Sequence, residues 1–156
     1  MNRPGTLALT FAALTTIFGL GLIGPTVAAD VTADRLSNAD KEPQNWLMNH
    51  RTYDAQRYSP LDRINKANVK SLKLAFAVAI GGTSVNENLE STPLAEDGFL
   101  YVVDQWGVVY KIDARSGDAG RIVWRMDPGQ EKIIAANRGA ALWGGSSSRS
   151  RIIRHA

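Results

Sequence analysis

The clearest indication of the fold is the segment NENLESTPLAEDGFLYVVDQWGVVYKIDARSG, from Asn86 to Gly117. LESTPLA, FLYVVD and VVYKID are short apolar runs separated by turn residues, a pattern typical of β-strands. Asp97 and Gly98 join the first two runs, and an Asp-Gly pair is a strong signal for a two-residue hairpin. QWG and ARSGDAG supply the next turns, and RIVWRMD closes the series. The pattern predicts an all-β unit, an antiparallel meander of about one four-stranded sheet.

Upstream of this stretch the sequence predicts one more strand and one helical turn. LKLAFAVA places Leu72, Leu74, Phe76 and Val78 on one face of a strand, with Lys73 and three alanines on the other. NKANVKSL has the Asn cap and the spacing of a short helix before this first strand. We expect that helix to pack Val69 and Leu72 inward.

The N-terminal segments differ in character from the meander. Residues 1–29 hold one early arginine, an apolar run and small residues before Asp30, which is the layout of a secretory signal peptide. The alternative is a membrane anchor, because the apolar run approaches the length of a spanning helix. The glycines and Pro25 would break such a helix and favour the signal peptide. We therefore expect no stable membrane span after cleavage. Residues 30–45 are polar and lack apolar periodicity, so we expect an extended lead-in.

Composition narrows the classes of function. The chain has no cysteine, which excludes disulfides and thiolate metal sites. Four of the 18 Lys and Arg residues lie near the two ends of the chain: Arg3, Arg149, Arg151 and Arg154. The remaining basic residues are balanced by 15 Asp and Glu residues. The body therefore has no basic excess, and nucleic acid is not an expected partner.

An isolated meander leaves two sheet edges unpaired and cannot cover both its faces. Residues from Pro128 onward are too few for a second copy and lack alternation. The sequence therefore predicts that residues 46–145 form one unit of a larger repeated structure. Residues 146–156, SSSRSRIIRHA, are rich in Ser and Arg. We interpret them as a tail produced by a shifted reading frame or a premature end.

Four motifs, in this order, resemble the amino-terminal region of the pyrroloquinoline quinone (PQQ)-dependent alcohol dehydrogenases. They are NWLMNHRTYDAQRYSPLDRINKANVKSLKLAF, ESTPLAEDGFLYVV, YKIDARSGDAGRIVW and NRGAALWG. The resemblance implies an eight-bladed β-propeller of four-stranded blades in a periplasmic enzyme that oxidises alcohols. It implies PQQ with Ca²⁺ or a lanthanide as cofactors, and a cytochrome c or a quinone as electron acceptor. IDARSG followed by Trp124 resembles the tryptophan-docking repeat that locks adjacent blades, although its spacing is longer than usual.

The resemblance also assigns two cofactor-binding residues. Glu90, in ESTPL, matches a glutamate that contacts the quinone, and Arg138, in NRGAALWG, matches an arginine that pairs with its carboxylate or carbonyl. A planar guanidinium suits this task because it binds a carboxylate through two charge-assisted hydrogen bonds. The alternative for each is an ordinary solvated charge at a strand edge or turn. Lys132 and Ile133 occupy the positions where many members have two adjacent cysteines.

Other polar residues carry no predicted chemistry. His50 and His155 are isolated, so neither forms a metal site, and no metal ligand is assigned in this chain. Four aspartates at strand ends or turns are expected to serve the turns: Asp97, Asp104, Asp113 and Asp127. The resemblance places the general base and the metal ligands downstream of this region. No catalytic residue is therefore assigned here, and we expect the chain alone to be inactive.

Two other functions fit the meander by itself. One is a non-enzymatic propeller-repeat protein that binds or scaffolds partners in the cell envelope. The other is a short subunit whose missing blades come from another chain. Glu90 and Arg138 favour the dehydrogenase, because a scaffold needs neither residue.

Overall fold

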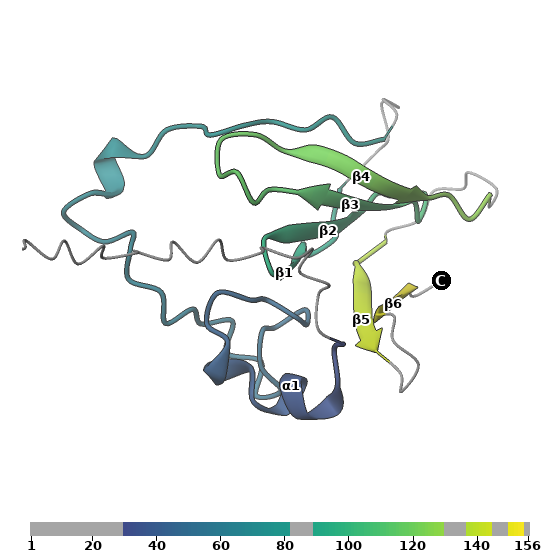
Figure 1. Ribbon diagram of the computed structural model, residues 1–156, viewed down its shortest axis with the longest axis horizontal. Coiled ribbons are helices and arrows are strands. Elements are labelled where there is room, and N and C mark those ends of the chain that lie inside the picture. The colour runs from purple at the N-terminus through teal and green to yellow at the C-terminus, as the bar shows by residue number, and fades with distance from the viewer. Residues whose placement is uncertain (1–29, 82–88, 130–136, 145–149, 155–156) are drawn as a thin grey trace, which may run out of the picture.

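The computed structural model describes residues 30–81, 89–129 and 137–144, and the backbone of residues 150–154. Strands make up most of the regular secondary structure in these ranges, and the helices are short (Figure 1). The helical elements are α1 (Ala33–Ser37) and the 3-10 turns η1 (Ala39–Lys41) and η2 (Val69–Ser71). The strands are β1 (Leu94–Glu96), β2 (Phe99–Val103), β3 (Val109–Asp113), β4 (Arg121–Met126), β5 (Ala140–Gly144) and β6 (Ser150–Arg154).

Strands β1 to β4 form one antiparallel sheet in the order β1-β2-β3-β4, which confirms the predicted meander. Asp97 and Gly98 make the β1–β2 turn with φ of 49° and 80°. Two positive φ values are the requirement of a type I′ turn, whose twist matches that of the paired strands. Gly98 also fits tightly, because a Cβ built on it would lie 2.6 Å from the Cγ of Arg115. The hairpin predicted from the Asp-Gly pair is therefore confirmed.

The strand predicted over residues 72–79 is not formed. This segment is extended but joins no ladder, and Leu72 and Leu74 are 58% and 85% exposed. Only its second half reaches the sheet, where Val78 and Ile80 pack against the cluster of Val102, Val108, Tyr110 and Ile112. The alternation was present, but a strand also needs a partner edge, and the described residues offer none to the first half of this segment.

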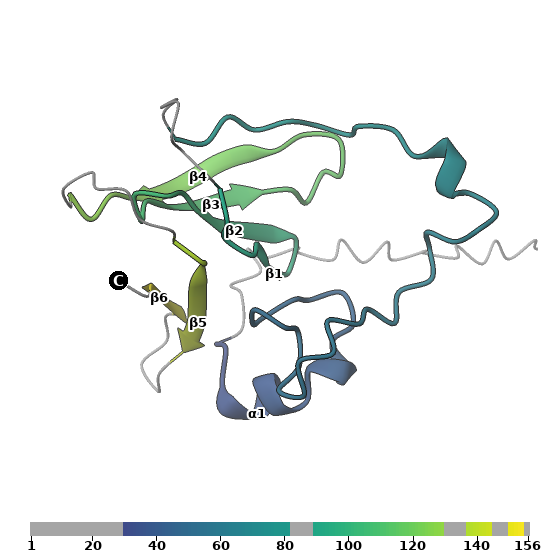
Figure 2. The same cartoon turned by 180° about the vertical axis from the view of Figure 1, so that it is seen from behind.

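The predicted helical turn exists as η2, but its expected packing is wrong. Val69 is 46% exposed and Leu72 is also exposed, so neither side chain is buried. Local polar contacts form the turn instead: Asn65 Oδ1 accepts a hydrogen bond from the Ala67 amide, and Asn68 Oδ1 accepts one from the Asn65 amide. The segment carrying η2 runs out from the sheets and returns along β4 (Figures 1 and 2).

The lead-in over residues 30–45 is not extended, contrary to the prediction. Thr32 caps α1, accepting a hydrogen bond from the amide of Arg35. The chain then continues through η1 to Trp46, whose backbone exchanges two hydrogen bonds with Ala95 at 2.8 and 2.9 Å. Residues 31–51, which we call the N-terminal cap, thus cover the outer edge of β1. The missing apolar periodicity misled the prediction because polar contacts hold these short helices.

The main core joins segments that are distant in sequence. Its buried members come from the N-terminal cap, from β1 and β2, and from β5: Val31, Leu47, Leu94, Tyr101 and Leu142. The amide of Gly144 donates to the carbonyl of Val31 at 2.7 Å, which fixes β5 against the cap. A Cβ on Gly144 would lie 2.7 Å from the Cβ of Asp30, so only glycine permits this approach.

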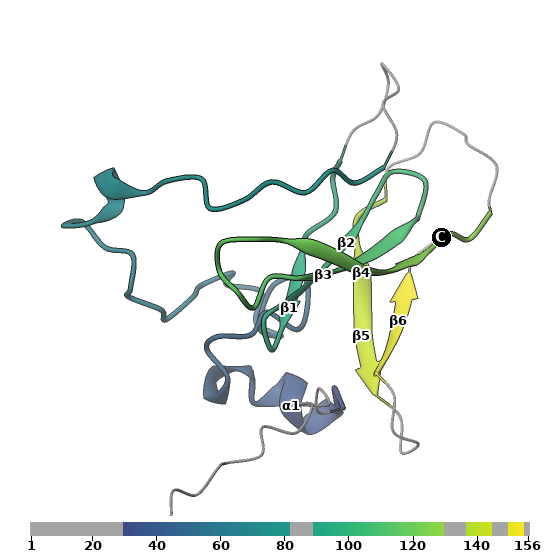
Figure 3. The same ribbon diagram turned by 45° about the horizontal axis from the view of Figure 1, so that its top comes forward.

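Strands β5 and β6 form a second, two-stranded antiparallel sheet beside the first (Figure 3). From the sequence we predicted no second copy of the meander after Pro128, because these residues are few and lack alternation. Pairing between the two segments supplies the order that neither shows alone: Ala140 pairs with Arg154 and Gly144 with Ser150. The described helices have only three to five residues and are too short to cross a bilayer.

Candidate functional site

Glu90 and Arg138 lie together in the structure. Glu90 precedes β1 and Arg138 precedes β5, so each sits where the chain enters a strand. Arg138 Nη1 lies 3.7 Å from Glu90 Oε2, and the amide of Thr92 donates to the carbonyl of Arg138 at 3.3 Å. The meeting of these two segments brings the two sequence-predicted residues to one place. Their cofactor role stays a prediction.

Both side chains remain accessible to a ligand. The side chain of Arg138 is 81% exposed and that of Glu90 is 41% exposed. A separation of 3.7 Å is an ion pair and exceeds hydrogen-bond length, and exposed pairs of this kind contribute about 0–1 kcal/mol. A ligand carboxylate could therefore engage the guanidinium without breaking a strong internal bond. The donor set fits a group that carries carboxylates and polar oxygens, as PQQ does.

Several other predicted features can be placed. His50 Nδ1 accepts a hydrogen bond from Arg57 Nε at 2.8 Å, so this imidazole pairs with a cation. Within the described ranges no three His, Cys, Asp or Glu side chains gather as a metal site. His155, Lys132 and Ile133 lie outside the described residues, as do residues 1–29.

Asp104 shows that a turn aspartate can be wholly structural. It is 7% exposed, and its Oδ1 accepts hydrogen bonds from the amides of Trp106 and Val108, both at 2.9 Å. Its Oδ2 accepts one from the hydroxyl of Tyr110 at 3.1 Å. This carboxylate therefore organises the β2–β3 turn, as the sequence predicted for the aspartates at turns.

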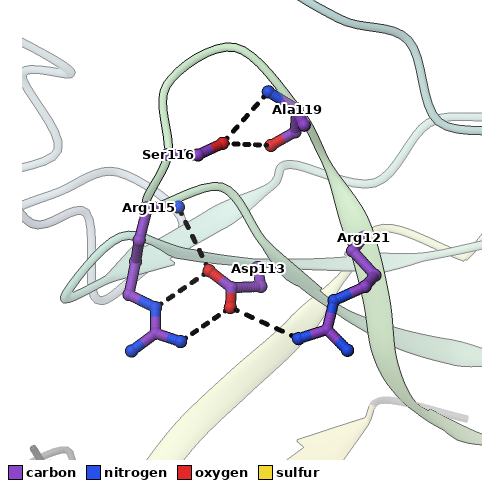
Figure 4. A pocket seen from close by; sticks show the side chains of 5 residues that line it. All are labelled: Asp113, Arg115, Ser116, Ala119 and Arg121. Atoms are coloured by element: carbon purple, nitrogen blue, oxygen red, sulfur yellow. Dashed lines mark hydrogen bonds and ion pairs between the residues drawn. The ribbon is translucent and has the colours of Figure 1, made fainter.

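A shallow hollow opens at the β3–β4 turn (Figure 4). Asp113 accepts two hydrogen bonds from the guanidinium of Arg115, at 2.9 and 2.7 Å, and lies 3.9 Å from Arg121 Nη2. These contacts, of which the hydrogen bonds from the Arg115 side chain have the largest effect, hold the pKa of Asp113 well below its usual range. Ser116 Oγ accepts from the amide of Ala119 and donates to its carbonyl. The polar groups that line the hollow thus bind mainly to one another.

Trp124 lies on β4 and is 43% exposed, opposite Lys111 in the sheet. Ile122 and Val123, its neighbours in the strand, are each 38% exposed. This part of β4 therefore presents apolar surface. The predicted docking of the indole against another blade is not tested by these residues alone.

Sequence reasoning missed a buried polar cluster formed by Arg35, Glu42, Glu96 and Tyr101. Glu96 has no exposed surface, and its carboxylate accepts from Arg35 Nη1 at 3.0 Å and from the hydroxyl of Tyr101 at 3.2 Å. Burial raises the pKa of Glu96, and burial with the nearby Glu96 raises the pKa of Tyr101. The signal was available, because Glu96 follows Leu94 by two residues and alternate residues of a strand share a face.

Arg35 also binds the second carboxylate of the cluster. Its Nε and Nη2 donate to Glu42 at 2.8 and 2.6 Å, and these hydrogen bonds lower the pKa of Glu42. Asn45 donates to Glu42 and to Asp97, at 2.8 and 3.2 Å. Since Glu96 and Asp97 belong to the β1–β2 hairpin, the cluster fastens the N-terminal cap to that hairpin.

Comparison with known proteins places this architecture in a family. Residues 46–156 match the family model for the β-propeller domain of PQQ-dependent glucose, ethanol and alcohol dehydrogenases. The quinohemoprotein alcohol dehydrogenase ADH-IIG of Pseudomonas putida is 39% identical over 93% of this chain and 21% of its own length. The dehydrogenase subunit of alcohol dehydrogenase (quinone) from Komagataeibacter europaeus is 40% identical, over 73% of this chain and 16% of its own. Subunit 1 of methanol dehydrogenase [cytochrome c] from Paracoccus denitrificans is 31% identical, over 98% and 25%.

Solved structures agree with these sequence relatives. The structure of ADHIIG from Pseudomonas putida superposes with a TM-score of 0.65 at 40% identity, covering 76% of this chain and 18% of that one. The quinohemoprotein alcohol dehydrogenase of Comamonas testosteroni gives 0.57 at 35% identity, covering 72% and 17%. The chain spans about a fifth of the length of these relatives. Its four-stranded sheet is a propeller blade, and the chain belongs to the PQQ-dependent alcohol dehydrogenase family.

Proposed function

We propose that this chain is the amino-terminal part of a periplasmic PQQ-dependent alcohol dehydrogenase, in which Glu90 and Arg138 contact the quinone. The observation that carries the proposal is the approach of Arg138 Nη1 to Glu90 Oε2, at 3.7 Å, in two segments that the fold brings together. When bound, the quinone supplies the two-electron oxidation of an alcohol to an aldehyde or ketone.

The roles of the two residues follow from their charge and exposure. The guanidinium of Arg138 has the planar fork that binds a carboxylate through two parallel hydrogen bonds. Glu90 accepts hydrogen bonds and limits where the guanidinium of Arg138 can point. Two exposed contacts give weak binding, so we expect this chain alone to hold the quinone only loosely and to oxidise no alcohol.

The complete protein would supply the remaining parts of the reaction. By family resemblance these are a Ca²⁺ or lanthanide ion, its ligands and a general base; among the described residues no three His, Cys, Asp or Glu side chains gather as a metal site. The names of the relatives, a quinohemoprotein, a quinone-linked enzyme and a cytochrome c-linked enzyme, support a cytochrome or a quinone as electron acceptor.

A fusion tests this proposal. Residues 30–144 would replace the matching region of the Pseudomonas putida ADH-IIG relative, and alcohol-dependent dye reduction would be measured with added PQQ and Ca²⁺. We expect an active fusion, and we expect Arg138→Ala to weaken quinone binding about tenfold or more, or about 1.4 kcal/mol. Arg121→Ala, at a side chain that is 77% exposed on β4, is the matched control and should bind normally.

Three results would contradict the proposal. The control could lose as much binding as Arg138→Ala, which would make the loss unspecific. The fusion could fold and still lack dehydrogenase activity, which would favour the scaffold function. The 156-residue chain could oxidise alcohol by itself, which would place a complete site within it.

A further inference from the structure

Arg138 is flanked by two residues that shape its backbone. The preceding residue, Asn137, is 8% exposed, and its Oδ1 accepts a hydrogen bond from the amide of Gly139 at 3.0 Å. An Asn side chain that binds the amide two residues later forms an Asx turn, which fixes the chain direction at the residue between. That intervening residue is Arg138.

Gly139 adds a second constraint, on the backbone conformation next to Arg138. Its φ is 131°, a region that residues with a Cβ rarely adopt. A Cβ built there would lie 3.4 Å from the carbonyl oxygen of Thr92 and 3.6 Å from its amide nitrogen. These are ordinary van der Waals distances, so the need for glycine at this position comes from its φ.

Two hydrogen bonds hold the segment that carries Glu90 in place. Ser91 Oγ accepts a hydrogen bond from the amide of Val103, at the end of β2, at 3.3 Å. The amide of Thr92 donates to the carbonyl of Arg138, also at 3.3 Å. One hydrogen bond thus ties the Glu90 segment to the blade, and the next ties it to Arg138.

We propose that Asn137 and Gly139 are positioning residues that hold Arg138 beside Glu90 for ligand binding. Neither is assigned a contact with the ligand; both act through the backbone of Arg138. Their role matters because an exposed arginine has many rotamers, and fixing its backbone reduces the entropy lost when it binds. This inference rests on the proposed function of Glu90 and Arg138.

The test uses the full 156-residue chain and two local readouts. The first is hydrogen exchange of the Thr92 amide, which reports its bond to Arg138 without any ligand. The second is the NMR signal of the Arg138 Nε–H during titration with PQQ, which detects weak binding. The melting temperature serves as the global measure of stability.

The variants separate positioning from folding. Asn137→Ala removes the Asx acceptor, Asn137→Asp keeps it, and Gly139→Ala places a Cβ on a residue whose φ of 131° L side chains rarely adopt. Asp127→Ala is the matched control, because Asp127 Oδ1 makes the same bond to Gly129, at 3.0 Å, in an exposed turn. We expect Asn137→Ala and Gly139→Ala to speed Thr92 exchange about tenfold, which is about 1.4 kcal/mol, and to weaken PQQ binding several-fold, which is about 1 kcal/mol. Asn137→Asp should restore both, and the control should change neither.

The outcomes separate this inference from the proposed function. Unchanged Thr92 exchange in both Asn137→Ala and Gly139→Ala would overturn the positioning role. Faster exchange with PQQ binding equal to that of the native chain would also overturn it. Faster exchange in a chain whose native form shows no response to PQQ would support the positioning of Arg138 while contradicting quinone contact by this chain. Loss of Thr92 protection together with a large fall in melting temperature for every Asn137 variant would mean a purely structural role.

Discussion

Nη1 of Arg35 lies 3.0 Å from Oε1 of Glu96, joining residues that are 61 positions apart. The side chain of Glu96 has no exposed surface, and that of Arg35 is 15% exposed. This pair is the buried charged contact between the N-terminal cap and the β1–β2 hairpin. The hairpin continues upstream into the segment that carries Glu90, so the stability of the cap bears on the candidate site.

Arg35→Ala should strongly destabilise the chain. Removing one partner of a buried ion pair leaves an uncompensated charge, here on Glu96, and typically costs about 3–5 kcal/mol. Urea unfolding at neutral pH measures the change in the free energy of unfolding. Arg121→Ala is the control, because the Arg121 side chain is 77% exposed and lies as far as 3.9 Å from its partner, Asp113. This substitution should cost less than about 1 kcal/mol. Equal losses in the two variants would contradict a special role for the buried pair.

The two carboxylates of the cluster should have opposite effects on the pH dependence of stability. Burial raises the pKa of Glu96 above its ordinary value of 4.5, so its folded form binds a proton more readily than its unfolded form. Its contribution to stability is present below pH 4.5 and is lost as the pH rises through the folded pKa. The hydrogen bonds from Arg35 lower the pKa of Glu42, whose contribution is present above pH 4.5 and is lost as the pH falls through the folded pKa.

Urea unfolding between pH 3 and pH 7 can separate these effects. The stability of the native chain relative to Glu96→Gln should decrease as the pH rises above about 4.5. The stability relative to Glu42→Gln should increase as the pH rises toward about 4.5 and should stay level above it. Parallel curves for the two variants would refute the opposite signs of these pKa shifts.

Gly98→Ala should destabilise the β1–β2 hairpin more than Gly117→Ala destabilises the β3–β4 turn. The two glycines have nearly the same φ, 80° and 79°, so both substitutions carry the strain of a positive φ, about 1 kcal/mol. A Cβ on Gly98 also meets Arg115 at 2.6 Å, whereas a Cβ on Gly117 meets nothing within 4 Å. The difference between the two midpoints of urea unfolding therefore measures the contact alone. No difference would show that Arg115 moves aside freely.

Leu142→Ala and Leu74→Ala compare the same substitution in two settings. Leu142 is 3% exposed and joins β5 to the main core, so its truncation should cost about 2–5 kcal/mol. Leu74 is 85% exposed, and its truncation should change the free energy of unfolding by less than about 0.5 kcal/mol. Thermal or urea unfolding measures both. A large loss at Leu74 would contradict the exposed position of residues 72–75.

The sequence predicted the meander well because its signals are local. The Asp97-Gly98 pair specifies its turn through backbone conformation, and β2 and β3 are short apolar runs between turn residues because both faces of the sheet are buried there. Alternation over residues 72–79 was equally clear, yet no ladder formed there, since a strand requires a partner that the run itself does not encode. Polar segments were harder still: α1 and η1 depend on contacts made by Arg35 with residues far along the chain.

For the candidate site, the resemblance could name Glu90 and Arg138, but their proximity depends on the fold. Asn137 and Gly139 carried little local signal, because an Asx turn and a positive φ at a single glycine acquire meaning only beside the segments that they position.

The sequence alone therefore determined the family, the four-stranded meander and the hairpin at Asp97 and Gly98, since residue types and short-range periodicity specify these features. The tertiary structure alone decided that the N-terminal cap folds onto β1, that Glu96 is buried beside Arg35, and that Arg138 lies next to Glu90. The physical reason is that burial and pairing are properties of segments meeting in space, and neither is contained in either segment by itself.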